Sequence, residues 1–410
     1  MTIHSTFTNA VDYDSLAARF RPIFARIGQG AEARERERSL PVEQIGWLKQ
    51  AGFGAVRVPL EQGGGGASLV QLVRLWIELA AADSNLTQAL RGHFAFVEDR
   101  LNAPPGPDRE RWLARFADGQ LVGNGWTEVG APALGEVQTK VTPEGEHWRL
   151  DGAKYYSTGS IFADWIDVYA ERADTGGKVI AAVSTHQPGV QRSDDWDGFG
   201  QRTTGSGTSL FDGARVERDD LIDFASRFVY QTAFYQLNLV SVLVGIGRAI
   251  ERDLSGQVRD RKRIYSHGNG PRAAEDPQVL QVVGQISAQV YAAEAVAISA
   301  AEAAQRVFDA HLAGDVEARH AANIEAELAS AKAQLVVAEL VLRSATELFD
   351  ALGASAVRVD QLLDRHWRNA RTAASHNPLI YKARIIGDWA VNRTEPPLVW
   401  KVGRGCGQTS

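Results

Sequence analysis

Two regularly spaced apolar stretches near the C-terminus limit what this chain can fold into more than any other feature. Apolar residues recur at steps of three and four, first over Val279–Val290 and then over Ile324–Phe349. That spacing places them on one face of a helix and predicts long helices that pack nearly antiparallel. Asp276-Pro277 is a typical helix start, and Gly353 is a typical helix end. The C-terminal part is therefore predicted to be a helical bundle.

The N-terminal part is also predicted to be helical. One helix face is indicated by the spacing of Leu16, Phe20, Ile23, Phe24 and Ile27. Further helices are expected over Pro41–Gly52, Leu69–Ala82 and Asn85–Leu101. The glycines at 63–66 are not followed by Gly-Lys-Ser/Thr, so this run predicts a loop and not a phosphate-binding P-loop.

Between these two parts the apolar pattern changes to a period of two. Trp148 and Leu150 alternate with polar residues before Asp151-Gly152, which is expected to form a turn. Gly176-Gly177 separates two further strand-like runs, 166–169 and 179–183. This pattern predicts a small antiparallel β domain.

The predicted class is α+β, with an N-terminal helical domain over 1–120, a middle antiparallel β domain over 121–223, a C-terminal four-helix bundle over 224–400 and a tail over 401–410. The stretch Phe228–Gly247 contains no charge and has the length of a membrane span. Its polar residues, Gln231, Gln236 and Asn238 among them, favour a helix buried in the protein core.

Composition and motifs exclude several classes of function. With 44 Lys+Arg against 50 Asp+Glu the net charge is -6, which disfavours nucleic acid as a partner. No signal-peptide pattern occupies Met1–Asp14, so a cytoplasmic location is expected, and the one cysteine, Cys406, cannot form an intramolecular disulfide. Motifs for a nicotinamide-binding Rossmann site, a zinc protease, an EF-hand and a serine hydrolase are absent, so no metal site is predicted.

Three turn-rich segments fall in or beside the middle domain, at 123–131, 151–159 and 205–208. In this order between two helical regions they resemble the acyl-CoA dehydrogenase superfamily, over nearly the whole chain. The resemblance implies a flavin held between the β domain and the bundle. It assigns Thr127 and Thr158 to the positions that hold the isoalloxazine ring.

The C-terminal motif departs from the dehydrogenase pattern. Dehydrogenases of this family commonly abstract an α-proton with a carboxylate here, whereas Trp367–Pro378 contains none and carries His376 and Asn377. This motif, together with Asp194-Asp195-Trp196, resembles the dibenzothiophene monooxygenase branch, whose members take reduced FMN from a separate reductase. The chain differs from them at Thr158, where they carry serine, and at Ala373, where they carry a second histidine.

The resemblance to this branch implies a two-component monooxygenase that oxygenates a hydrophobic organosulfur, nitrogen or aromatic substrate through a C4a-hydroperoxyflavin. His376 and Thr158 are the expected catalytic residues, with Asn377 assisting and His93 facing the substrate. For His93 a structural role inside the helical core is the alternative. The residues expected to bind the cofactor are Asn124, Trp126, Thr127, Thr158, Trp196, Arg263 and Arg368.

The expected cofactor is FMN, with FAD as the alternative. The segment Gly353-Ala354-Ser355-Ala356 lacks glycines that a close diphosphate approach requires, whereas Arg263 could bind one terminal phosphate. The resemblance also implies a homotetramer. Two other functions stay open: an FAD-dependent acyl-CoA dehydrogenase with its glutamate on another helix, and a flavin-bearing protein of this fold that binds nucleic acid or a protein.

Overall fold

The computed structural model describes residues 11–129 and 136–399, so Cys406, the tail and part of the first turn-rich segment lie outside the described residues. The N-terminal helices are α1 (Tyr13–Ala18), α2 (Arg21–Gln29), α3 (Ala31–Glu37), α4 (Val42–Gln50), α5 (Leu69–Ala82), α6 (Ser84–Ala89), α7 (Arg91–Asn102) and α8 (Pro107–Ala117). The first predicted helix is divided into α1 and α2, because Pro22 starts a new helix. The helix expected over 85–101 is likewise divided at Leu90.

The middle part forms one sheet of strands β1 (Val122–Gly125), β2 (Lys140–Glu144), β3 (His147–Lys154), β4 (Trp165–Arg172), β5 (Lys178–Ser184), β6 (Val190–Arg192), β7 (Ser209–Glu217) and β8 (Leu221–Asp223). The strand order is β6-β7-β3-β2-β4-β5-β8, with β1 beside β4. Most pairs are antiparallel, but β1 and β2 both run parallel to β4. The sheet is therefore mixed, which corrects the expectation of a purely antiparallel domain.

Asp151-Gly152 does not form the predicted turn and lies inside β3, where the register shifts between Leu150 and Gly152. Glycine is needed there because φ is +148° and a Cβ would lie 2.5 Å from the Thr139 hydroxyl oxygen. The residue thus permits a bulge and a close approach of two strands. Gly176-Gly177 does separate β4 from β5, as predicted.

The C-terminal part contains α9 (Gln231–Asp260), α10 (Pro277–Leu312), α11 (Val316–Leu352), α12 (Asp364–Ser375) and α13 (Leu379–Asn392). Both long predicted helices are confirmed. Asp276 accepts hydrogen bonds from the Gln278 and Val279 amides at the start of α10, and Gly353 follows the end of α11. Among the described residues α13 is a helix beyond the four expected.

Helix α9 is apolar and long enough to cross a membrane, but 94% of its apolar window is buried inside the protein. It packs between the other long helices and α5, as the prediction of a core helix required. Trp76 of α5 meets Phe234 of α9 and Phe94 of α7 edge to face, at 5.4 and 5.5 Å between ring centroids. This aromatic cluster joins the N-terminal helices to the bundle.

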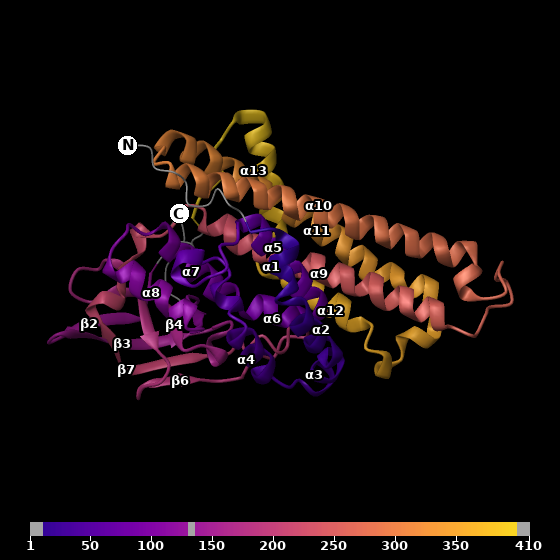
Figure 1. The fold of residues 1–410 in the computed structure, drawn as a ribbon, viewed down its shortest axis with the longest axis horizontal. Helices are drawn as coiled ribbons and strands as arrows, with labels where there is room; N and C mark the ends of the chain where they lie inside the picture. The colour runs from indigo at the N-terminus through magenta and orange to yellow at the C-terminus, as the bar shows by residue number, and fades with distance from the viewer. Residues whose placement is uncertain (1–10, 130–135, 400–410) are drawn as a thin grey trace, which may run out of the picture.

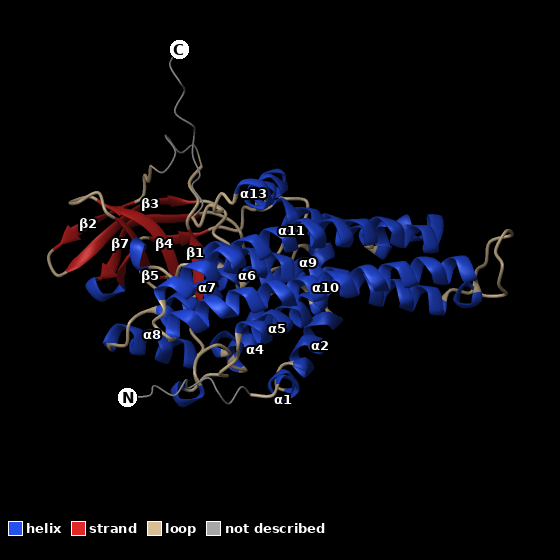
Figure 2. Cartoon of the chain, turned by 90° about the horizontal axis from the view of Figure 1, so that it is seen from above, coloured by secondary structure: helices blue, strands red, loops and turns tan. Residues whose placement is uncertain are grey.

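The sheet lies at one end of the molecule, and the long helices α9, α10 and α11 extend away from it toward the other end (Figures 1 and 2). The N-terminal helices pack along one side of the bundle and reach the sheet through α7 and β1. The α+β class, with a sheet between two helical parts, is confirmed. As domain boundaries we propose 120/121 and 223/224, which lie close to the ends of α8 and β8.

Candidate functional site

The second turn-rich segment brings Thr158 to the end of β3. Its hydroxyl lies 2.8 Å from the Ser206 hydroxyl, which in turn lies 2.7 Å from that of Thr204. The Ser157 amide donates to the Gly207 carbonyl at 2.9 Å. Thr158 and Ser206 are 48 positions apart in sequence. Their two segments therefore form one hydroxyl-rich cluster of turns, which we call the turn cluster.

The first turn-rich segment lies beside this cluster. The Asn124 amide donates to the Thr158 carbonyl at 3.4 Å, and the Tyr155 amide donates to the Thr127 carbonyl at 2.8 Å. Trp126 is fixed by a 2.8 Å hydrogen bond from its Nε1 to Asp167. The two segments predicted to hold the flavin ring are thus adjacent in space.

Gly159 sets the turn cluster against the N-terminal helices. Its φ is +77°, and a Cβ at this position would lie 2.0 Å from the Ala89 carbonyl oxygen of α6. Any side chain there would push the turn away from the helix. The glycine therefore places Thr158 close to the segment where α6 ends and α7 begins.

His376 follows the last residue of α12; the residue reaches the surface of the chain, but protein atoms surround its imidazole ring. Its Nδ1 lies 3.5 Å from Nη1 of Arg91, at the start of α7. Because a guanidinium only donates, Nδ1 is the acceptor and Nε2 carries the proton. The surrounding protein atoms, and then the charge of Arg91, hold the pKa of His376 well below its usual value. The ring is neutral at physiological pH and its Nε2–H remains a donor.

The loop that carries His376 is tied to two bundle helices. The Asn377 side chain donates to Gln236 of α9 at 2.8 Å, and its carbonyl accepts from Gln334 of α11 at 2.8 Å. Asn377 is therefore positioned to hold the loop, and its amide nitrogen is already engaged.

Arg91 was not among the predicted site residues. It is 5% exposed, its guanidinium lies 5.3 Å from the ring centre of Tyr235, and its Nε has no hydrogen-bond partner among the described residues. The sequence contains a pattern from which Arg91 could have been predicted as a site residue. Positions 87, 88, 94 and 95, one helical turn away, hold Thr, Gln, Phe and Ala, so no carboxylate neighbours this charge on its helix face.

His93 lies away from these groups, inside the core. Its Nε2 is 2.8 Å from the Gly54 carbonyl, and its Nδ1 accepts the Val122 amide at 3.2 Å. Burial lowers its pKa to about 4, so the ring is neutral. Both nitrogens are used, and we therefore propose a structural role in place of the substrate contact expected from the resemblance.

The remaining residues predicted to bind the cofactor lie in different parts of the structure. Trp196 packs edge to face on Tyr156, with 5.9 Å between ring centroids, and so lies beside the turn cluster. Arg368 pairs with Glu35 at 2.7 Å and with Asp364 at 2.8 Å, which ties α12 to α3. Arg263 is exposed in the loop between α9 and α10, at the end of the bundle far from the sheet (Figure 1). Within one chain it does not join the other site residues.

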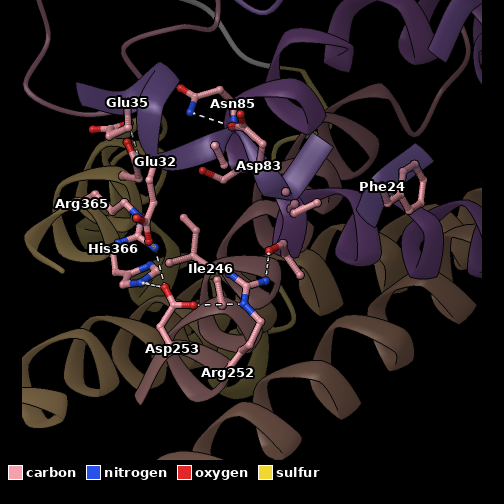
Figure 3. Close-up of a pocket in the computed structure, with 18 of the residues that line it drawn as sticks. Phe24, Glu32, Glu35, Asp83, Asn85, Ile246, Arg252, Asp253, Arg365 and His366 are labelled. Atoms are coloured by element: carbon pink, nitrogen blue, oxygen red, sulfur yellow. Dashed lines mark hydrogen bonds and ion pairs between the residues drawn. The ribbon is translucent and has the colours of Figure 1, made fainter. Parts of the chain in front are cut away.

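A cavity of about 560 Å³ lies elsewhere, between the N-terminal helices and the bundle helices α9 and α12 (Figure 3). Asp253 at its wall pairs with Arg365 at 2.5 Å and with His366 at 3.0 Å. None of the predicted catalytic or cofactor-binding residues lines this cavity. The carboxylates that line it are already paired with arginines, several of which lie outside the cavity wall. The site with the predicted chemistry is the junction between the turn cluster and His376.

This junction fits a flavin. Thr158 and Ser206 supply hydroxyls, His376 supplies a neutral N–H, and Trp126 and Tyr156 supply aromatic surface. The buried hydroxyl of Tyr235 lacks a partner among the described residues, as does Nε of Arg91. A ligand bound at this junction would give both groups a partner.

Comparison with known proteins identifies relatives along most of the chain. Residues 16–120 match the family described as "Acyl-CoA dehydrogenase, N-terminal domain", and residues 237–379 match "Acyl-CoA dehydrogenase, C-terminal domain". Dibenzothiophene monooxygenase of Mycolicibacterium goodii is 27% identical over 85% of this chain and 87% of its own length. A probable FMNH2-dependent monooxygenase, SfnC of Pseudomonas putida, is 26% identical over 92% of this chain and 94% of its own.

A similar solved structure is that of TdsC from Paenibacillus sp. A11-2 in complex with FMN and indole. It superimposes with a TM-score of 0.83 at 27% sequence identity, over 93% of this chain and 98% of TdsC. The likeness therefore includes all three parts of the fold and not the helical parts alone.

Proposed function

Since the chain belongs to the acyl-CoA dehydrogenase superfamily and is a flavin-dependent monooxygenase within it, we propose that it oxygenates a small hydrophobic organosulfur, nitrogen or aromatic compound. Its cofactor is FMN, which a separate flavin reductase supplies in reduced form. The observation that carries this proposal is the neutral His376 beside Arg91, in the loop where dehydrogenases of the superfamily place a carboxylate.

Each group at the junction has a separate task. Bound reduced FMN supplies the electrons that activate dioxygen. Thr158, with Asn124 and Thr127 beside it, holds the flavin ring, while Trp126, Tyr156 and Trp196 provide apolar surface that excludes water.

His376 donates a hydrogen bond from Nε2 toward the reacting oxygen, because Arg91 keeps the proton off Nδ1. Asn377 fixes the loop that presents this ring. As a neutral imidazole the group is also able to accept and return a proton, which an amide or hydroxyl does less readily.

Titration of the flavin-free protein with FMN and FAD, followed by flavin fluorescence, tests the cofactor. We expect FMN to bind at least as tightly as FAD. Tight FAD binding with negligible FMN binding would contradict this assignment.

Addition of fatty acyl-CoA esters to the oxidised flavoprotein without oxygen distinguishes the dehydrogenase alternative. We expect no bleaching of the flavin absorbance, because residues 367–378 contain no carboxylate to abstract an α-proton. Rapid bleaching would favour an FAD-dependent acyl-CoA dehydrogenase. We further propose a cytoplasmic homotetramer, which the resemblance described from the sequence implies.

A further inference from the structure

Arg91 differs from the other buried arginines in lacking a counter-ion. Six arginines are buried in the described part of the chain: Arg34, Arg57, Arg91, Arg100, Arg227 and Arg365. The other five pair with Asp83, Glu98, Asp99, Asp167 and Asp253, respectively, at 2.5 to 3.1 Å. The neighbours that the structure gives Arg91 are His376 and Tyr235, and both are neutral.

The unused edge of the guanidinium is the edge that binds oxyanions. Arg57 shows the arrangement within this chain, since its Nε and Nη2 donate to the two carboxylate oxygens of Glu98 at 3.0 and 2.9 Å. In Arg91 the contact to His376 uses Nη1, while Nε and Nη2 donate to no described residue. This leaves a two-pronged donor whose geometry matches a carboxylate, sulfinate or sulfonate group.

Burial of an unpaired cation is costly, and a ligand that brings a negative charge removes the cost. Burial lowers the pKa of Arg91 to about 10, so the group is still charged at physiological pH. The ring of Tyr235 lies against the guanidinium, 5.3 Å from its centre, and offers it no negative charge. An oxyanion bound to Arg91 would supply the missing counter-charge.

We propose that Arg91 binds an anionic group of the substrate, so that the substrate class is a small organic oxyanion with an apolar body. The assignment rests on the proposed function, because it places the substrate at the same junction as His376. Arg91 then determines specificity and orientation, while His376 acts on the transferred oxygen. The flavin is the other ligand that carries negative charge to this site, because its reduced ring and its phosphate are both anionic.

Calorimetric titration of the flavin-free protein tests the proposal with matched pairs of probes. Benzenesulfinate and methyl phenyl sulfoxide have similar shapes and differ in charge, as do benzoate and benzamide. We expect the anion of each pair to bind about 10- to 100-fold more tightly, which is the usual effect of a hydrogen-bonded charge pair. Equal affinities within both pairs, or no binding of either anion, would overturn the proposal.

Variants identify the residue responsible. Arg91→Gln should abolish the preference for the anion, and Arg91→Lys should retain part of it. Arg115→Gln, which removes an arginine on α8 that pairs with Asp220, should leave the preference intact. Thermal unfolding checks that each variant folds. If Arg91→Gln does not fold, the anion preference of Arg91→Lys and of the unchanged protein still tests the proposal.

FMN affinity, measured on the same variants, separates the two sources of negative charge. We expect Arg91→Gln to change FMN affinity less than about threefold, well below its effect on the anions. A large loss of FMN or reduced FMN binding with unchanged anion preference would assign Arg91 to the cofactor and overturn the proposal. If the protein discriminates the anions but does not bind FMN, the proposed function fails and the anion site stands.

Discussion

At the scale of single residues, the histidines of this chain differ in which ring nitrogen is left free. His93 and His376 are both neutral, but His93 uses both nitrogens on backbone groups, whereas His376 uses Nδ1 on Arg91 and keeps Nε2–H. The amino-acid type predicted neither outcome, because the partners come from Gly54, Val122 and Arg91, which are distant in sequence from the ring they contact. Only the second arrangement leaves a donor for chemistry.

Replacing His376 by alanine should uncouple the enzyme. Reduced FMN would still consume oxygen, but more of it would appear as hydrogen peroxide and less as oxygenated product. Loss of one hydrogen bond to a developing charge costs about 2.7 to 4 kcal/mol, a rate effect on the order of 10² to 10³. The ratio of peroxide to product measures the effect, and FMN affinity serves as the control. A folded, flavin-binding variant with normal coupling would show that His376 is structural.

Replacing His93 by leucine should reduce stability without uncoupling the enzyme. The substitution leaves the buried Val122 amide and the Gly54 carbonyl without partners, at a cost of about 2 to 5 kcal/mol in the free energy of unfolding. Urea unfolding measures this cost. Uncoupling comparable to that of His376→Ala, in protein that remains folded, would restore His93 to the active site.

His93 also makes the stability of the folded protein depend on pH. The pKa of His93 is about 4 in the folded protein against 6.5 unperturbed, so between these values the unfolded chain binds the proton and the folded chain does not. Stability therefore falls as pH decreases from about 6.5 to 4, by about 3 kcal/mol from this group. The loss over that range should be smaller in His93→Leu than in the unchanged protein.

At the scale of elements, local signals predicted the helices better than the sheet. Asp276 and Gly353 determine helix ends through groups within a few residues, and both were found from the sequence. The parallel pairing of β1 and β2 with β4 depends on segments far apart in the chain, which alternation alone does not relate. Gly152 was expected in a turn because of its conformational freedom. In the structure it lies in a strand, where the lack of a side chain lets Thr139 approach closely.

Glu128 connects its own segment to β3 and to the residues before β2, beside the site. Its carboxylate accepts from Lys154 at the end of β3 at 2.7 Å, and from the backbone amides of Gln138 and Thr139 before β2 at 2.8 and 3.0 Å. These contacts overcome the opposing effect of burial and lower the pKa of Glu128 to about 2. The stability that the carboxylate contributes is therefore present above pH 4.5 and is lost only as pH falls toward 2.

Glu128→Gln should destabilise the sheet by about 3 to 5 kcal/mol at neutral pH, because the buried Lys154 amine loses its partner and is forced to give up its proton or remain an unpaired charge. Thermal unfolding measures the loss. Glu171→Gln is the matched control in the same sheet, since its pairs with Lys140 and Lys178 are nearer the surface and are worth about 0 to 1 kcal/mol. Equal effects of the two substitutions would contradict a special role of the buried pair.

At the scale of the whole molecule, the position of Arg263 bears on assembly. The loop between α9 and α10 that carries Arg263 lies at the end of the bundle away from the sheet, so this arginine does not reach the turn cluster that holds Thr158 in its own chain (Figure 1). Helices α10 and α13 also expose apolar side chains, with Tyr291 79%, Ile380 75% and Val391 80% accessible. Large exposed apolar groups favour contact with another copy. If Arg263 binds the FMN phosphate, the arginine must come from a neighbouring subunit.

Mixing two defective variants tests this shared site. Arg263→Gln and Thr158→Val should each weaken FMN binding in homogeneous assemblies, the mass of which light scattering should give as four chains. After dissociation and random reassembly in equal amounts, a site is intact when its own chain has Thr158 and its neighbour has Arg263. Each condition holds in half of the cases, so about a quarter of the sites should recover tight FMN binding. If Arg263 acts within its own chain or only on the surface, the mixture will bind FMN no better than its components.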